Sequence, residues 1–125
     1  MTFIKTVIKS TLIIDQEEYK NSNLKSIFKE NELTLDIVTQ EHDYMAMIDH
    51  NKYDCIVIDS DLPRNQTEKI IDDIKVKYPS TIVIILLKLP DYEKVIKFVR
   101  LGADDFIVKP FTWEDIEIIL TYYYY

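Results

Sequence analysis

The sequence contains one cysteine, one glycine and two histidines among its 125 residues. Because Cys55 is the only cysteine, an intramolecular disulfide is excluded, and its place in an apolar run predicts a buried core residue in a reducing compartment. His42 and His50 have no cysteine or carboxylate at the spacing of a zinc site, so we expect both on the surface. The single glycine, beside abundant Ile, Lys, Asn and Tyr, indicates compositional bias rather than a function.

Positive charge and long apolar runs are also scarce. The 15 Lys and Arg residues are outnumbered by 22 Asp and Glu residues, and the net charge of -7 argues against nucleic-acid binding by this chain, since a phosphate backbone requires a basic face. The longest apolar run, "IVIILL" at 82–87, is the size of a strand and too short to span a membrane. Lys5 and Lys9 interrupt the first apolar residues, so we expect no signal peptide, no membrane contact and a cytoplasmic location.

Short apolar runs alternate with amphipathic segments along the chain. Apolar residues make up 47% and charged residues 30%, which is typical of a soluble globular protein. We expect one domain over residues 11–125, preceded by a lead at 1–10 that is an extra strand or disordered. The expected strands are 11–15, 33–38, 55–59, 81–87 and 105–108. Three of them are nearly continuous in apolar residues, as expected where both faces of a sheet are covered.

Segments with helical periodicity separate these strands. Their apolar stripes are Leu24, Ile27 and Phe28; Tyr44, Met45 and Ile48; Ile70, Ile71, Ile74 and Tyr78; and Tyr92, Val95, Ile96 and Val99. A last helix opens at "TWED", where Thr112 can cap and Asp115 can act as the capping-box acid. Its apolar face would consist of Trp113, Ile116, Ile119, Leu120 and Tyr123. Five βα units without a linker or repeat predict a three-layer α/β domain with a mostly parallel sheet.

Three charged residues fall at the carboxyl ends of expected strands, where ligands bind in such folds. They are Asp15, Asp59 in the run "IVIDSDLP" (56–63), and Lys109. Two carboxylates held close together repel each other and favour a divalent cation, for which Mg²⁺ is suited. A cation there would let the carboxylate of Asp59 attack a phosphoryl group, and Lys109 could pair with the acyl phosphate that forms. The structural alternatives are that Asp59 only ends a strand and that Asp15 caps a helix.

Three segments carry a resemblance to a known family. The run "YDCIVIDSDLP" at 53–63 resembles the phosphoacceptor strand of response-regulator receiver domains, and "LGADDFIVKPF" at 101–111 resembles their last strand with its Lys-Pro pair. The run "TLIIDQEE" at 11–18 lies where the family has an acidic pair, and the order of elements matches over residues 11–125. This resemblance implies a CheY-like, flavodoxin-like (βα)5 sandwich with strand order 2-1-3-4-5.

The resemblance also implies roles for individual residues. Asp59 would be the phosphoacceptor and Lys109 the phosphate-contacting lysine, while Asp15, Asp59 and the backbone carbonyl of Asp61 would bind Mg²⁺. Phe106 matches the aromatic residue of the family's switch. The implied partners are a sensor histidine kinase or a phosphotransfer protein, and an output partner or an output domain outside this sequence. A homodimer through the last two βα units is a further expectation.

The sequence departs from the family at several site positions. Gln16 replaces the second acid, which is a direct metal ligand, so Mg²⁺ affinity should fall unless Glu17 compensates. Leu87 replaces the Ser or Thr whose hydroxyl couples phosphorylation to the aromatic switch. Lys88 follows where a small residue is usual, and the glycine expected near Thr67 is missing.

Three functions therefore compete. The first is a receiver phosphorylated on Asp59, which is not an enzyme beyond accepting a phosphoryl group. The second is a degenerate receiver that binds partners without phosphorylation, which Gln16 and Leu87 favour. The third is a haloacid-dehalogenase-type phosphatase with Asp59 as nucleophile and Asp61 as general acid. Pro63 disagrees with that family's motif, and the chain is short for its later acids. We predict the first.

Overall fold

The computed structural model describes residues 10–15, 23–38 and 44–124, which form five strands, a short 3-10 helix and five α-helices within these ranges. In chain order the elements are β1 (Ser10–Ile14), α2 (Asn23–Glu30), β2 (Thr34–Val38), α3 (Tyr44–Asn51), β3 (Cys55–Asp59), η1 (Pro63–Asn65), α4 (Gln66–Lys77), β4 (Ile82–Leu87), α5 (Tyr92–Leu101), β5 (Asp105–Val108) and α6 (Trp113–Tyr124). All five expected strands are confirmed within a residue at either end. Strand β1 begins at Ser10, inside the expected lead, and the rest of that lead lies outside the described residues.

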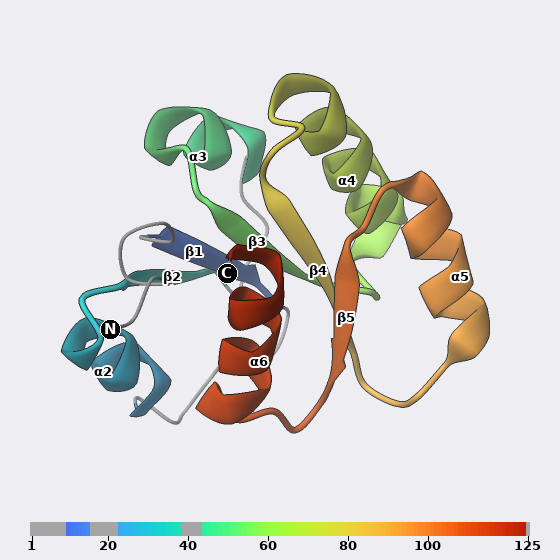
Figure 1. The fold of residues 1–125 in the computed structure, drawn as a ribbon. Coiled ribbons are helices and arrows are strands. Elements are labelled where there is room, and N and C mark those ends of the chain that lie inside the picture. The colour runs from blue at the N-terminus through green and yellow to red at the C-terminus, as the bar shows by residue number, and fades with distance from the viewer. Residues whose placement is uncertain (1–9, 16–22, 39–43, 125) are drawn as a thin grey trace.

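The five strands form one parallel sheet in the order β2-β1-β3-β4-β5. This is the predicted flavodoxin-like order, with β3 at the centre and β5 at an edge. Figure 1 shows helices α2 and α6 on one face of the sheet and α3, α4 and α5 on the other. The predicted three-layer arrangement is therefore confirmed.

Alternate residues of each strand divide the core into two layers. Every residue of β3 is buried: Ile56 and Ile58 pack toward α3, α4 and α5, while Cys55 and Val57 pack toward α2 and α6. Cys55 lies in the core as expected, and burial raises the pKa of its thiol. This double coverage explains why the central strands read as continuous apolar runs.

The start of α6 tests the predicted capping box, and the end of α5 has a backbone geometry of its own. At the start of α6, the Asp115 carboxylate accepts a hydrogen bond from the Thr112 amide at 2.8 Å, which is the acid's half of the expected capping box. The Thr112 hydroxyl also lies 3.3 Å from that carboxylate. At the end of α5, Gly102 adopts a φ of 118°, which disfavours residues with a Cβ.

The apolar stripe predicted for α5 as its core-facing side is wrong for most of its members. Tyr92, Ile96 and Val99 are exposed, and the residue that anchors the helix in the core is Phe98. Val95 is only partly buried against the core. Apolar residues occupy more than one side of this helix, so their spacing alone does not decide which side meets the sheet.

No helix within the described part of the chain is long and apolar enough to cross a membrane.

Candidate functional site at the carboxyl ends of the strands

The structure brings together the three charged residues that the sequence placed at strand ends. Asp59 is the last residue of β3 and is completely buried, and Asp15, directly after β1, is 1% exposed. Lys109 follows β5, and its ammonium lies 2.9 Å and 2.8 Å from the two carboxylate oxygens of Asp15. Since β1 and β3 are neighbours in the sheet, the two buried acids end adjacent strands. Two acids and a lysine thus occupy one edge of the sheet.

Local backbone contacts hold Lys109 and the end of β3 in place. The Lys109 amide donates to the Leu87 carbonyl at 2.8 Å, and the Lys109–Pro110 peptide bond is cis. The Ser60 amide donates to the Leu86 carbonyl at 2.9 Å, which continues the β3–β4 pairing past Asp59. Both sides of the site are therefore anchored on β4.

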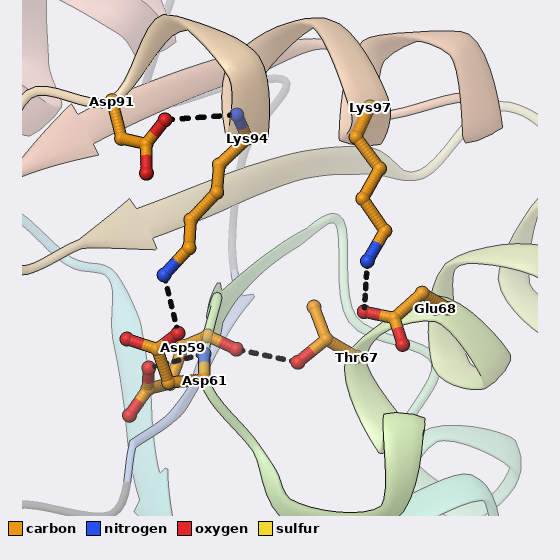
Figure 2. A network of polar contacts seen from close by, with 7 residues as sticks. All are labelled: Asp59, Asp61, Thr67, Glu68, Asp91, Lys94 and Lys97. Carbon is orange, nitrogen blue, oxygen red and sulfur yellow. Dashed lines mark hydrogen bonds and ion pairs between the residues drawn. The ribbon is translucent and has the colours of Figure 1, made fainter.

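Asp59 is held at two points by the loop and helix that follow it. The Asp61 amide donates to Oδ1 of Asp59 at 2.9 Å, and the buried Thr67 hydroxyl donates to the Asp59 carbonyl at 2.7 Å (Figure 2). Thr67 occupies the region where the resemblance predicted a glycine, and sequence reasoning assigned it no role. The available signal was a threonine in the first turn of the helix that follows β3.

A second lysine enters the site from α5. The Lys94 ammonium lies 2.6 Å from Oδ1 of Asp61, and its side chain extends from the first turn of α5 toward the carboxylates of Asp59 and Asp61 (Figure 2). The hydrogen bond to Asp61 raises the pKa of Lys94, the charges of Asp61, Asp91 and Asp59 add to it, and burial opposes it. Sequence reasoning missed Lys94, because it had not established which side of α5 faces the sheet.

The oxygen atoms at this edge of the sheet are of the type that binds a magnesium ion. Among the described residues there is no group of three or more His, Cys, Asp or Glu side chains that could hold a metal ion. Mg²⁺, however, often takes only one or two protein carboxylates and completes its shell with waters. The buried carboxylates of Asp15 and Asp59 and the carbonyl of Asp61 are the oxygens that would hold it. Gln16, the atypical member of the expected set, lies outside the described residues.

The two positions expected to form the switch differ in their surroundings. Leu87 is buried in the core on the α3–α5 side of the sheet, so it presents no hydrogen-bonding side chain to the site. Phe106 lies on the edge strand β5 and is 38% exposed. Lys88, directly after β4, is exposed. The family resemblance predicts a hydroxyl at residue 87, but the leucine there packs into the core instead.

Comparison with known proteins gives a consistent picture. The family model of the response regulator receiver domain matches residues 11–121. Response regulator ArlR of Staphylococcus haemolyticus is 36% identical over 110 residues, which cover 84% of this chain and 48% of ArlR. Chemotaxis protein CheY of Listeria monocytogenes is 27% identical over 103 residues, which cover 80% of this chain and 85% of that protein.

Solved structures agree with the fold. The beryllofluoride-activated NtrC4 receiver domain dimer has a TM-score of 0.80 at 26% identity, covering 94% of this chain and 97% of that one. Vibrio cholerae chemotaxis protein CheY4 has a TM-score of 0.78 at 17% identity, covering 92% and 98% of the two chains.

Several relatives are longer proteins. The chain spans about half the length of ArlR, and 23% of a cyclic di-GMP phosphodiesterase of Thermotoga maritima that is 31% identical over 86 residues. The shared part is the receiver domain, and members of this family generally bind Mg²⁺ and are not enzymes in the ordinary sense. From the match over residues 11–121 and the CheY-like fold, we conclude that the protein belongs to the response regulator receiver family of two-component signalling.

Proposed function

We propose that Asp59 accepts a phosphoryl group from a sensor histidine kinase or a phosphotransfer protein. The observation that supports this most is the placement of a completely buried carboxylate at the end of the central strand, beside the Asp15–Lys109 pair. Burying a carboxylate costs free energy, so a buried carboxylate is normally retained for a function. The same strand end carries the receiver-family motif.

The proposed reaction is a direct displacement. A carboxylate oxygen of Asp59 attacks the phosphorus of a phosphohistidine, a new O–P bond forms, and the P–N bond breaks with its electron pair retained by the imidazole. When bound, Mg²⁺ would neutralise charge between the carboxylate and the phosphoryl oxygens. The amide of Asp61 keeps the acceptor oriented through its bond to Oδ1, and Lys109 offers a cation to the product after releasing Asp15.

We place the output surface on the exposed side of α5, β5 and α6. Its apolar side chains are Tyr92, Ile96 and Val99 of α5, Phe106 of β5, and Ile118 and Tyr122 of α6. Exposed apolar side chains on a receiver are suited to contact with a partner protein or a second copy of the chain. The NtrC4 receiver domain forms a dimer in its beryllofluoride-activated state, which supports a homodimer as one use of this surface. We propose that the domain works in the cytoplasm, in keeping with its lone buried cysteine.

A phosphorylation-independent binding module is the second candidate. The specific observation in its favour is Leu87, whose buried side chain cannot donate a hydrogen bond to a phosphoryl oxygen. Membership of the receiver family favours both of these candidates over a haloacid-dehalogenase-type phosphatase. Turnover of an aryl phosphate would identify the phosphatase, because a receiver would show none.

Intact mass tests the proposal. The protein is incubated with Mg²⁺ and acetyl phosphate, in parallel with Asp59→Asn and with Asp72→Asn as a control for charge, since Asp72 is exposed on α4. We expect one phosphoryl adduct on the parent and on Asp72→Asn, and none on Asp59→Asn. A folded parent that gains no adduct at high Mg²⁺ would refute phosphorylation and favour the binding module.

A further inference from the structure

Lys94 links α5 to the loop that follows β3, which contains Asp61, in a way that the family resemblance does not account for. Its ammonium forms an ion pair with Asp61, two residues after the acceptor, while its backbone amide donates to the cap residue Asp91 at 3.2 Å. The two side chains of the pair are 40% and 35% exposed. A pair this exposed adds little to the stability of the fold, because solvent screens it. Stability alone therefore gives little reason for the contact.

The side chain of Lys94 extends toward the carboxylate of Asp59 as well as that of Asp61 (Figure 2). The hydrogen bond to Asp61 is the largest cause of the raised pKa of Lys94, and the charge of Asp59 adds a smaller contribution. Asp61 is itself bonded through its amide to Asp59. A phosphoryl group added to Asp59 would therefore lie close to the Lys94 ammonium.

The usual coupling route is missing from this chain. Leu87 fills the place of the hydroxyl that would follow a phosphoryl group, and it is buried in the core. Lys109 follows β5, is anchored on β4 through the Leu87 carbonyl, and pairs with Asp15. Lys94 contacts Asp61 in the loop that follows β3, whereas Lys97, one turn later in α5, pairs with Glu68 of α4 (Figure 2).

We infer that Lys94 is a second phosphoryl-binding cation, which exchanges Asp61 for the phosphoryl oxygens on Asp59 and so transmits phosphorylation to the first turn of α5. This inference rests on the proposed phosphorylation of Asp59. A phosphoryl group carries more negative charge than the exposed carboxylate of Asp61 and offers three acceptor oxygens, so it competes well for one flexible ammonium. The same turn carries the exposed Tyr92, and Ile96 follows it, which connects the exchange to the proposed output surface.

Beryllofluoride, as a non-covalent phosphoryl analogue, provides the test on the full chain. Its affinity and the amide chemical shifts that it induces are measured with Mg²⁺ for the parent, Lys94→Met, Lys94→Arg and Lys97→Met. Losing one charge-assisted contact should weaken binding by about tenfold in Lys94→Met and leave the amides of α5 close to their unbound shifts. Lys94→Arg should recover most of the response, and Lys97→Met should match the parent.

The outcomes separate this inference from the proposed function. If Lys94→Met binds beryllofluoride with the parent's affinity and shows the parent's α5 shifts, the role of Lys94 is refuted while phosphorylation of Asp59 stands. If Lys97→Met loses as much as Lys94→Met, the effect is general loss of positive charge and the inference is again refuted. If the folded parent binds no beryllofluoride, the proposed function fails, and the role of Lys94 fails with it.

Discussion

Asp59 is fixed through both its backbone and its side chain. Thr67 donates to its carbonyl, and the amide of Asp61 donates to its carboxylate. Because a nucleophile must be held close to its line of attack, these two contacts should affect the rate of phosphorylation as well as stability. The residue that replaces the family's glycine thus has a definite structural role.

Replacing Thr67 with valine tests this role. Valine keeps the shape but removes the buried hydroxyl, so we expect the free energy of unfolding in urea to fall by about 1–3 kcal/mol. We also expect slower formation of the acetyl-phosphate adduct, measured by intact mass. Thr67→Ser retains the donor and should phosphorylate near the parent rate. Equal rates for the valine variant and the parent would show that the hydroxyl is dispensable for the reaction.

The sequence was sufficient to predict some of these residues and not others. Asp15, Asp59 and Lys109 lie at the ends of parallel strands, and such ends share one edge of a sheet whatever the details of packing. The contact of Lys94 depends on how α5 is rotated on the sheet, which apolar spacing left open. Thr67 lies on the buried face of α4 that the spacing predicted, but that spacing does not say which acceptor its hydroxyl meets. Gln16 lies outside the described residues, so its role stays a prediction.

At the scale of secondary-structure elements, α5 carries both Lys94 and three of the six exposed apolar residues of the proposed output surface, Tyr92, Ile96 and Val99. Its start is fixed by Asp91, which accepts a hydrogen bond from the Lys94 amide, and its end by Gly102. Phe98 is buried and Val95 is partly buried against the core, while Tyr92, Ile96 and Val99 are left for solvent or a partner. A surface kept apolar at this position is consistent with the proposed output.

Gly102→Ala should destabilise the protein. The position has a φ of 118°, and an added Cβ would lie 2.8 Å from Cγ of Lys75. That lysine has little freedom to move, since its ammonium binds the Asp104 carboxylate at 2.9 Å and the Thr81 carbonyl at 3.2 Å. We expect a loss of about 1–3 kcal/mol in urea unfolding. Lys97→Ala, at an exposed position of the same helix, should change stability by less than about 0.5 kcal/mol; similar losses for both variants would contradict the argument.

At the scale of the whole molecule, the alternation of apolar runs and amphipathic segments was enough to predict the three layers. Strands that are buried on both faces have no solvent-facing side, so their sequences are continuously apolar instead of alternating. The strand order 2-1-3-4-5 came from the family resemblance, and the structure confirms it. One consequence of this order is that two buried acids end adjacent strands.

Magnesium should therefore stabilise the folded protein as a whole. A ligand that binds only the native state at tenfold its dissociation constant adds about 1.4 kcal/mol. We expect the Tm to rise with MgCl₂ in the parent and in Asp72→Asn, and to rise less in Asp15→Asn and Asp59→Asn. The exposed Asp72 matches the change in net charge, which is needed because the chain carries a net charge of -7. Equal rises in all four proteins would indicate general screening instead of a site.

The most direct test of the central claim is to locate the acyl phosphate chemically. The protein is treated with acetyl phosphate and Mg²⁺, reduced with borohydride, which converts a phosphorylated aspartate to homoserine, and digested for peptide mass spectrometry. The account predicts homoserine at residue 59 and unchanged aspartate at residues 15 and 61. Homoserine at either of those residues instead of 59, or at none of the three in a folded protein, would contradict it.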